Sequence, residues 1–333
     1  MVGGVIAVQL FYLVSGFVIS LIISEKRYKT LKAFYFSRFL RLYPTYILVA
    51  ALTFLGLVAE RSLGGSSPFF SLMENLGNPI KMFLGFANTT MLFQDWVMFL
   101  GINGSEVVFV SAFYEESVQL WQGLLIPQAW TLGVEIAFYL IAPYILTRRR
   151  LLIAIAISSL CLRLIFIEHG LGLSDPWTYR FFPLEIGTFA LGALAHQFLL
   201  PLIRRGDKLR VKKTSTLVTF GFALIILTYP LLPGSPVTLR VLITFACVIF
   251  LPYFHIFQEN RKFDRFVGEI SYPLYICHVL VLRFILQLDE YTNNSYTASF
   301  RFVTIVASVA FAVFLNITVV QRIDKFRIRL RNF

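Results

Sequence analysis

Apolar runs of 17 to 22 residues recur along almost the whole chain, and they constrain its fold more than any other feature. At about 1.5 Å per residue, each run is long enough as a helix to cross roughly 30 Å of hydrocarbon. The runs are apolar on all sides, whereas the strands of a membrane barrel alternate in polarity over segments of about ten residues. The sequence therefore predicts an all-α fold, a polytopic transmembrane helix bundle.

Nine spans are predicted, and no linker or water-soluble domain separates them, so the chain is interpreted as a single integral-membrane domain over residues 1–333. The predicted spans are 5–24, 43–60, 131–147, 151–168, 182–202, 215–232, 238–257, 270–288 and 300–321. A further run at 81–100 contains polar residues from Asn88 to Asp95 that interrupt it. We interpret this run as an interfacial or re-entrant element rather than a tenth span.

The net charge of +12 follows the predicted topology, because five connectors hold 23 of the 30 basic residues. These connectors are 25–42, 148–150, 203–214, 258–269 and 322–331, and they all fall on one side if 81–100 does not cross. The positive-inside rule then places the C-terminus in the cytoplasm and the N-terminus outside. The basic charge is thus explained by the lipid bilayer, and no nucleic-acid partner is predicted. The three cysteines lie inside apolar runs without metal-type spacing, so no metal site is predicted either.

The segment LKAFYFSRFLRLYPTY at 31–46 places Arg38 and Arg41 three residues apart among aromatic side chains. On a helix the two guanidinium groups would lie on one face and could grip a phosphate or pyrophosphate, while a ring such as Tyr35 could stack on a base. The alternative is a basic face that anchors the helix to lipid phosphates.

Glu135 and His278 are among the ionisable residues within predicted spans, where such groups are costly and invite a functional interpretation. Glu135 follows Trp130 by about one turn and a half, and its structural alternative is an ion pair with Arg163, Arg180 or Arg283. His278 shares a helical stripe with Ser271 and Tyr275, and its alternative is a hydrogen-bonded core residue.

The segment YRFFPLEIGTFALGALAH at 179–196 combines Arg180 and Glu185 with a series of small residues. The small residues predict close helix packing. Arg180 and Glu185 are expected either to line an outer cavity or to form ion pairs.

Five segments resemble the acyltransferase-3 family of multi-pass bacterial membrane acyltransferases, and they occur in the family's order. They are AVQLFYLVSGFVIS (7–20), AFYFSRFLRLYPTY (33–46), AWTLGVEIAFYLIAPYIL (129–146), RFFPLEIGTFALGALA (180–195) and ISYPLYICH (270–278). The resemblance implies a ten-helix core in the bacterial inner membrane. This chain carries nine of those helices, and the family's first helix, with an arginine and a histidine regarded as the catalytic base, is expected to be missing from its N-terminus.

The resemblance also implies a function, the transfer of an acyl group from cytoplasmic acyl-CoA, commonly acetyl-CoA, to a hydroxyl of a cell-surface glycan or lipid-linked sugar. Arg38 and Arg41 match the family's Arg-x-x-Arg motif and are assigned to the donor together with Tyr35. Glu135 matches a family acid, and His278 is the candidate base within this chain. Residues assigned to the acceptor are Ser15, Trp130, Arg180 and Tyr275. Two alternatives remain open, a transporter or flippase for a lipid-linked sugar and a catalytically inactive relative of the enzymes.

Overall fold

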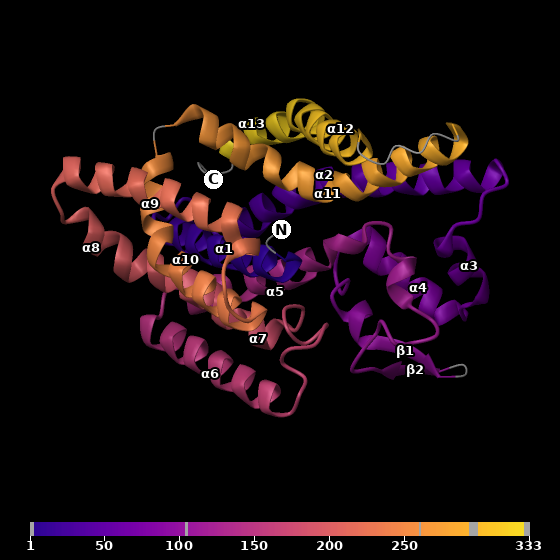
Figure 1. The fold of residues 1–333 in the computed structure, drawn as a ribbon, viewed down its shortest axis with the longest axis horizontal. Helices are drawn as coiled ribbons and strands as arrows, with labels where there is room; N and C mark the ends of the chain where they lie inside the picture. Colours follow the sequence, from indigo (N-terminus) through magenta and orange to yellow (C-terminus); the bar gives the residue numbers. More distant parts are fainter. Residues whose placement is uncertain (1–2, 104–105, 260, 293–298, 330–333) are drawn as a thin grey trace. The chain divides into compact units, whose positions relative to one another are not determined.

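The computed structural model describes residues 3–103, 106–259, 261–292 and 299–329, and most of these residues are helical (Figure 1). The α-helices are α1 Gly4–Ser24, α2 Leu31–Ser62, α3 Pro68–Asn75, α4 Asn78–Thr90, α5 Trp130–Ile145, α6 Arg149–Glu168, α7 Phe182–Leu194, α8 Leu200–Arg204, α9 Lys208–Thr228, α10 Pro236–Gln258, α11 Lys262–Thr292, α12 Ser299–Leu315 and α13 Gln321–Arg329. Short π-helical segments, Ala195–Leu199 and Asn316–Val320, join α7 to α8 and α12 to α13.

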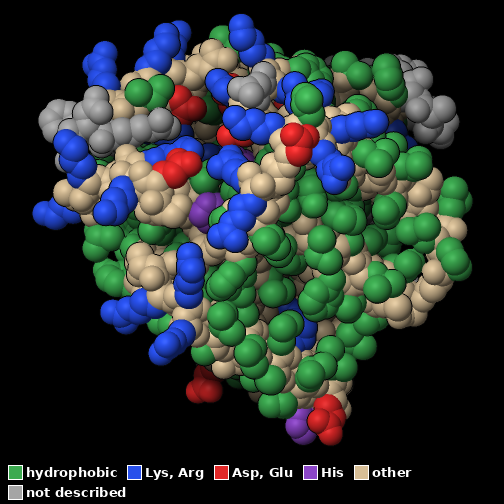
Figure 2. Space-filling model, turned by 90° about the vertical axis from the view of Figure 1, so that its left-hand side faces the viewer, with side chains coloured by type: hydrophobic (Ala, Val, Ile, Leu, Met, Phe, Trp, Pro, Cys, Tyr) green, Lys and Arg blue, Asp and Glu red, His purple; other side chains and the backbone are tan. Residues whose placement is uncertain are grey.

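Eight helices in the described residues are long and apolar enough to cross a membrane. They are Gly4–Ser24, Leu31–Ser62, Arg149–Glu168, Phe182–Arg204, Lys208–Thr228, Val237–Gln258, Lys262–Leu288 and Phe300–Arg329. Hydrophobic side chains cover much of the face in Figure 2, as expected for a surface in contact with lipid. The all-α membrane fold is therefore confirmed.

One predicted span, 131–147, is not among these eight helices. It corresponds to α5, which has 16 residues. At about 1.5 Å per residue this helix is roughly 24 Å long, which is shorter than the hydrocarbon layer. It starts only at Trp130, since the preceding Pro127–Ala129 forms a separate turn of 3₁₀ helix.

Two predicted spans, 43–60 and 270–288, are the apolar parts of longer helices that begin earlier in the sequence. α2 starts at Leu31 rather than at 43. The Thr30 side chain caps this start, because it accepts a hydrogen bond of 3.2 Å from the backbone N–H of Ala33. α11 starts at Lys262 rather than at 270. Hydropathy marks the part of a helix that lies in lipid, whereas the helix itself continues into polar sequence.

The chain divides into two compact units, which we describe separately. The first unit comprises Met1–Tyr28 and Val134–Lys262, and the second comprises Lys29–Gly133 and Phe263–Phe333.

In the first unit, α7 packs against both α1 and α6. The α1–α7 crossing is close enough that a Cβ atom on Gly16 would lie 2.0 Å from the carbonyl oxygen of Phe189. A Cβ atom on Gly192 would likewise lie 2.0 Å from the carbonyl oxygen of Leu13. The two helix backbones therefore touch at both glycines, which confirms the close packing expected from the small residues of α7.

In the second unit, the run 81–100 does not form one helix. α4 ends at Thr90, and Met91 and Phe93 have positive φ angles of 64° and 61°. At 13 residues, α4 is too short to span a bilayer. The prediction that 81–100 is not a tenth span is thus confirmed.

Polar residues of this broken run hold it in place. The Asn88 amide donates to the Gly123 carbonyl at 2.8 Å and accepts from the Leu125 N–H at 2.8 Å. The Gln94 amide donates to the Tyr46 hydroxyl of α2 at 2.5 Å, and that hydroxyl donates to the Asn88 carbonyl at 2.8 Å. The polar side chains therefore replace the regular hydrogen bonds that a continuous helix would have made.

A small antiparallel hairpin follows, with β1 at Leu100–Asn103 paired to β2 at Glu106–Phe109. The sequence predicts no strand, so this hairpin is a difference between the predicted and the observed fold. Four residues per strand are too few for a periodic signal, and the pairing is visible only in three dimensions.

The α1–α7 crossing yields a stability prediction. We expect Gly192→Ala to lower the stability by about 1–3 kcal/mol, because the new methyl group meets backbone atoms that cannot turn aside. The measurement is the thermal unfolding midpoint of the purified protein in detergent. Gly221→Ala on α9 is the matched control, since a Cβ atom there meets nothing within 4 Å. Equal midpoints for the two variants would contradict the close crossing.

Candidate functional site

A pocket of about 230 Å³ lies in the second unit, where α11 and α13 meet α2. It is lined by Arg41, Arg265, Gly268, Glu269, Tyr272, Pro273, Val320, Asp324 and Arg327. The Tyr272 hydroxyl donates to the Leu42 carbonyl at 2.7 Å and thereby ties α11 to α2 next to Arg41. The pocket thus unites three parts of the chain that lie far apart in sequence.

Three arginines and two carboxylates line this pocket. Arg327 forms an ion pair with Asp324, and its Nε donates to the Ser37 hydroxyl at 3.3 Å. Arg41 and Arg265 are exposed and form no ion pair with another described residue. The pocket therefore presents two guanidinium groups to a ligand, and their planar donors suit a phosphate or a diphosphate.

The structure separates the residues predicted to bind the donor. Arg41 lines the pocket, whereas Arg38 is only 4% exposed and its guanidinium lies 5.9 Å from the centroid of the Phe34 ring. Tyr35 is half-buried against the same Phe34 ring at 5.4 Å and is not among the lining residues. A spacing of three residues rotates the second arginine by about 60° around the helix, so one is buried while the other faces the pocket.

Glu135 lies in the first unit, where it is 4% exposed. The Ser15 hydroxyl of α1 donates to its Oε1 atom at 3.0 Å, and the Tyr139 hydroxyl, one turn further along α5, donates to the same oxygen. Two hydroxyl donors thus hold the Glu135 carboxyl group in place by hydrogen bonds. Ser15, predicted to contact the acceptor, therefore contacts Glu135.

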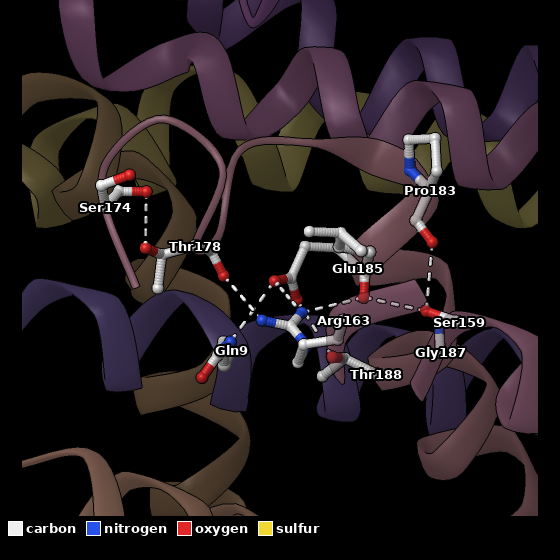
Figure 3. A network of polar contacts seen from close by, with 10 residues as sticks. Gln9, Ser159, Arg163, Ser174, Thr178, Pro183, Glu185, Gly187 and Thr188 are labelled. Carbon is white, nitrogen blue, oxygen red and sulfur yellow. Dashed lines mark hydrogen bonds and ion pairs between the residues drawn. The ribbon is translucent and has the colours of Figure 1, made fainter. Parts of the chain in front are cut away.

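Arg163, the first structural partner considered for Glu135, instead pairs with Glu185 of α7 (Figure 3). Its Nη2 atom lies 2.7 Å from Glu185 Oε1, and its Nη1 atom donates to the Thr178 carbonyl at 2.8 Å. The Glu185 carboxylate also accepts from Gln9 of α1 at 3.3 Å and from Thr188 at 3.0 Å. This network joins α1, α6, α7 and the loop before α7, and a buried pair of this kind is satisfied by its hydrogen bonds.

Arg180 is held in the same loop by Asp175. Its Nε and Nη2 atoms donate to the two carboxylate oxygens at 2.6 and 2.9 Å, and the guanidinium lies 4.8 Å from the centroid of the Tyr179 ring. Burial alone would lower the pKa of Arg180, but the hydrogen bond to Asp175 raises it overall. The ion pairs expected for Arg180 and Glu185 thus exist, with Asp175 and Arg163 as partners.

A third polar group surrounds Tyr275 in the second unit. The Tyr275 hydroxyl donates to the Gln128 carbonyl at 2.5 Å and lies 2.8 Å from the Thr131 hydroxyl. The Gln128 amide in turn donates to the Ile276 carbonyl at 2.9 Å. These contacts fasten the start of α5 to the middle of α11.

His278 is half-buried on α11, and its Nδ1 atom lies 2.8 Å from the Tyr275 carbonyl oxygen. A carbonyl oxygen only accepts, so Nδ1 carries the proton in this contact. In the neutral imidazole, Nε2 is then the atom that can accept a proton. Ser271, the third residue of the predicted stripe, is exposed and donates to the Val267 carbonyl at 2.7 Å.

Trp130 begins α5, and only 5% of it is exposed. Contact between Trp130 and the acceptor stays a prediction, and the structure shows that the residue is buried. The candidate residues thus occur in three groups, the pocket with Arg41 and the group around Tyr275 in the second unit, and the group around Glu135 in the first unit.

Asp95 is a buried acid, whereas the sequence pattern indicates only that it is a polar interruption of the run 81–100. It is 6% exposed, and its Oδ1 atom would lie 2.3 Å from a Cβ atom on Gly133. Burial raises its pKa to about 7, although hydrogen bonds from the backbone N–H groups of Asp95 and Trp96 lower it. A carboxyl within an apolar run was the available signal. The sequence also does not single out Arg265 and Arg327 as site residues. Both belong to basic connectors, and the charge of a connector does not show which of its side chains line a pocket.

The fold and these groups define a class of protein, a polytopic helical membrane protein with a pocket lined by three arginines. Comparison with known proteins specifies the class further. The family described as an acyltransferase domain, acyltransferase-3, matches residues 2–317. The chain belongs to the acyltransferase-3 family and is a multi-pass membrane protein.

An uncharacterized protein of Aquifex aeolicus (strain VF5) is 28% identical over 213 residues, which cover 62% of this chain and 90% of that relative. No solved structure matches the chain significantly.

The raised pKa of Asp95 yields a prediction on pH dependence. The folded state holds this proton more tightly than the unfolded chain, in which the pKa is near 3.8, so stability decreases as the pH rises from about 4 to about 7 and levels off above. We expect Asp95→Asn to gain stability relative to the wild type as the pH rises through this range, by about 4 kcal/mol at pH 8.

Thermal unfolding midpoints at pH 5 and pH 8 test this prediction. Glu74→Gln is the control, because its side chain is 60% exposed in an ion pair with Arg61. A difference between Asp95→Asn and the wild type that does not change with pH would contradict the burial of an ionisable group at this position.

Proposed function

We propose that this protein transfers an acyl group, commonly acetyl from acetyl-CoA, to a hydroxyl of a cell-surface glycan or lipid-linked sugar. Membership in the acyltransferase-3 family supports the transfer of an acyl group. The observation that carries the choice of donor is the pocket lined by Arg41, Arg265 and Arg327, whose donors are complementary to the diphosphate of coenzyme A.

The proposed membrane orientation agrees with this choice. The pocket is built from the start of α2, the start of α11 and α13, and each of these elements lies in or next to a strongly basic connector. The positive-inside rule assigns these connectors and the C-terminus to the cytoplasm, where acyl-CoA is made. We therefore place the protein in the bacterial inner membrane with the pocket open to the cytoplasm.

In the proposed reaction, the acceptor hydroxyl oxygen forms a bond to the thioester carbonyl carbon while the carbon–sulfur bond breaks. A general base takes the hydroxyl proton, and the coenzyme leaves as the thiol after it receives a proton. His278 is suited to this role, because its Nδ1 proton is held by the Tyr275 carbonyl and its Nε2 atom remains an acceptor.

Glu135 is the second candidate, a carboxylate held by Ser15 and Tyr139, and we assign it the positioning of a partner group or of the acceptor. Contact with the acceptor remains a proposal for Ser15, Trp130, Tyr275 and Arg180. In this proposal Arg41 binds the donor in the pocket. Arg38 and Tyr35 lie on the same helix, α2, and support the position of Arg41.

We expect Arg41→Ala and Arg265→Ala each to weaken coenzyme A binding about 10- to 100-fold, the loss typical of a charge-assisted hydrogen bond. The measurement is equilibrium binding of coenzyme A to the purified protein. Lys32→Ala is the matched control, since it removes an exposed positive charge from the same helix, and Lys32 does not line the pocket. Wild-type affinity in both arginine variants would contradict the assignment of the donor to this pocket.

A second experiment tests the base. In His278→Asn, the amide can still donate a hydrogen bond to the Tyr275 carbonyl, but no general base is present. We therefore expect the rate of acetyl transfer to fall about 10²- to 10⁴-fold while coenzyme A binding stays unchanged. Thiol release and labelled acetyl transfer to a carbohydrate acceptor provide the readout. An unchanged rate would exclude His278 as the base. Coenzyme A binding without any transfer in the wild type would favour an inactive relative, and sugar movement without an acyl product would favour a transporter.

A further inference from the structure

A second pocket, of about 590 Å³, lies in the first unit where α8 ends, α9 begins and α10 ends. It is lined by Arg204, Gly206, Lys208, Val211, Lys212, Thr216, Ile256, Phe257, Glu259 and Arg261. Because α9 and α10 belong to candidate membrane spans that start and end at this point, the pocket lies at the boundary between lipid and water.

The polar side of this pocket is strongly basic, with four basic side chains and one carboxylate. Glu259 pairs with Arg204 at 2.9 Å, and both side chains remain about half exposed. Lys208, Lys212 and Arg261 form no ion pair with another described residue. Lys208 and Lys212 are one turn apart on α9 and present their charges on the same side of the helix.

Arg261 is positioned by an aromatic ring, since its guanidinium carbon lies 3.7 Å from the centroid of the Phe257 ring. A cation held over a ring in this way keeps its N–H donors available at the ring's edge. The pocket therefore combines two flexible ammonium groups with one guanidinium that is already oriented.

The other side of the pocket is apolar and continues onto an exposed helix surface. Phe257 packs edge to face against Phe220 of α9 at a centroid distance of 5.9 Å, and Phe220 is 63% exposed. Further along α9, Leu224 and Leu227 are 61% and 79% exposed. Basic groups at the end of an apolar helix face match a molecule with an anionic head and hydrocarbon tails.

We propose that this pocket binds the phosphodiester headgroup of an anionic phospholipid, whose acyl chains lie along the exposed apolar face of α9. Lys208, Lys212 and Arg261 bind the phosphate oxygens, and Phe220 and Phe257 contact the glycerol backbone and the first methylene groups. A soluble phosphate would use the basic side chains only, whereas a membrane lipid uses both sides of the pocket. The site is separate in its residues from the pocket that contains Arg41, so it does not depend on the proposed acyl donor.

The test compares two double variants of the full chain in mixed micelles. Lys208→Gln/Lys212→Gln removes two charges from the pocket, and Arg210→Gln/Lys213→Gln removes two from the same helix at residues that do not line it. Phosphatidylglycerol binding is measured by native mass spectrometry. We expect about 30-fold weaker binding in the pocket variant, the loss typical of two basic groups at a lipid surface, and less than about threefold in the control.

Three competing ligands identify the source of the phosphate. Phosphatidylcholine, with the same phosphate and chains but no net charge, should bind more weakly than phosphatidylglycerol, and glycerol 3-phosphate at equal concentration should not displace the lipid. Equal loss in the two double variants, equal binding of the two lipids or displacement by glycerol 3-phosphate would overturn the proposal. Displacement by coenzyme A that depends on Lys208 and Lys212 would also overturn it and would assign the pocket to the acyl donor.

Discussion

The close crossing of α1 and α7 is the contact on which the first unit depends. Gly16 and Gly192 bring the two helix backbones into contact, and the polar side chains of α1 can then reach their partners across a short distance. Gln9 contacts Glu185 near one end of the crossing, and Ser20 lies 2.9 Å from His196 near the other. In hydrocarbon, such groups have no water to bind, so each needs a partner within the protein. Separation of the two helices would therefore cost the packing and the hydrogen bonds together.

In the second unit, much of the backbone is irregular, so its polar groups need hydrogen-bond partners outside regular helices. Asn88, Gln94 and Tyr46 satisfy the backbone where the run 81–100 breaks, and the Tyr275 group fastens the start of α5 to α11. Against this fixed frame, the pocket with Arg41 lies at the ends of its helices, where long basic side chains reach water without the cost of burial in lipid. The arrangement is compatible with the charged, water-soluble donor that we propose for this pocket.

The two basic pockets share a lining of several Lys or Arg residues, but we assign them different ligands. Both lie at the ends of candidate spans, and both derive from the connectors that carry most of the positive charge. The pocket with Arg41 is surrounded by polar groups of three elements, whereas the pocket with Lys208 continues onto an exposed apolar helix face. This difference in surroundings, rather than the charge itself, is the physical basis for assigning a soluble phosphate donor to the former and a lipid to the latter.

The sequence by itself determined the all-α membrane fold, the approximate position of its long helices and the close packing of α7, because hydropathy and residue size act locally and can be read one helix at a time. It also predicted ion pairs for Arg180 and Glu185. Only the tertiary structure decided their partners, the burial of Arg38 beside an exposed Arg41, the hairpin of β1 and β2, and the environment of Asp95. These features depend on contacts between segments many residues apart, and no local pattern specifies which of several possible partners a side chain meets once the helices have packed.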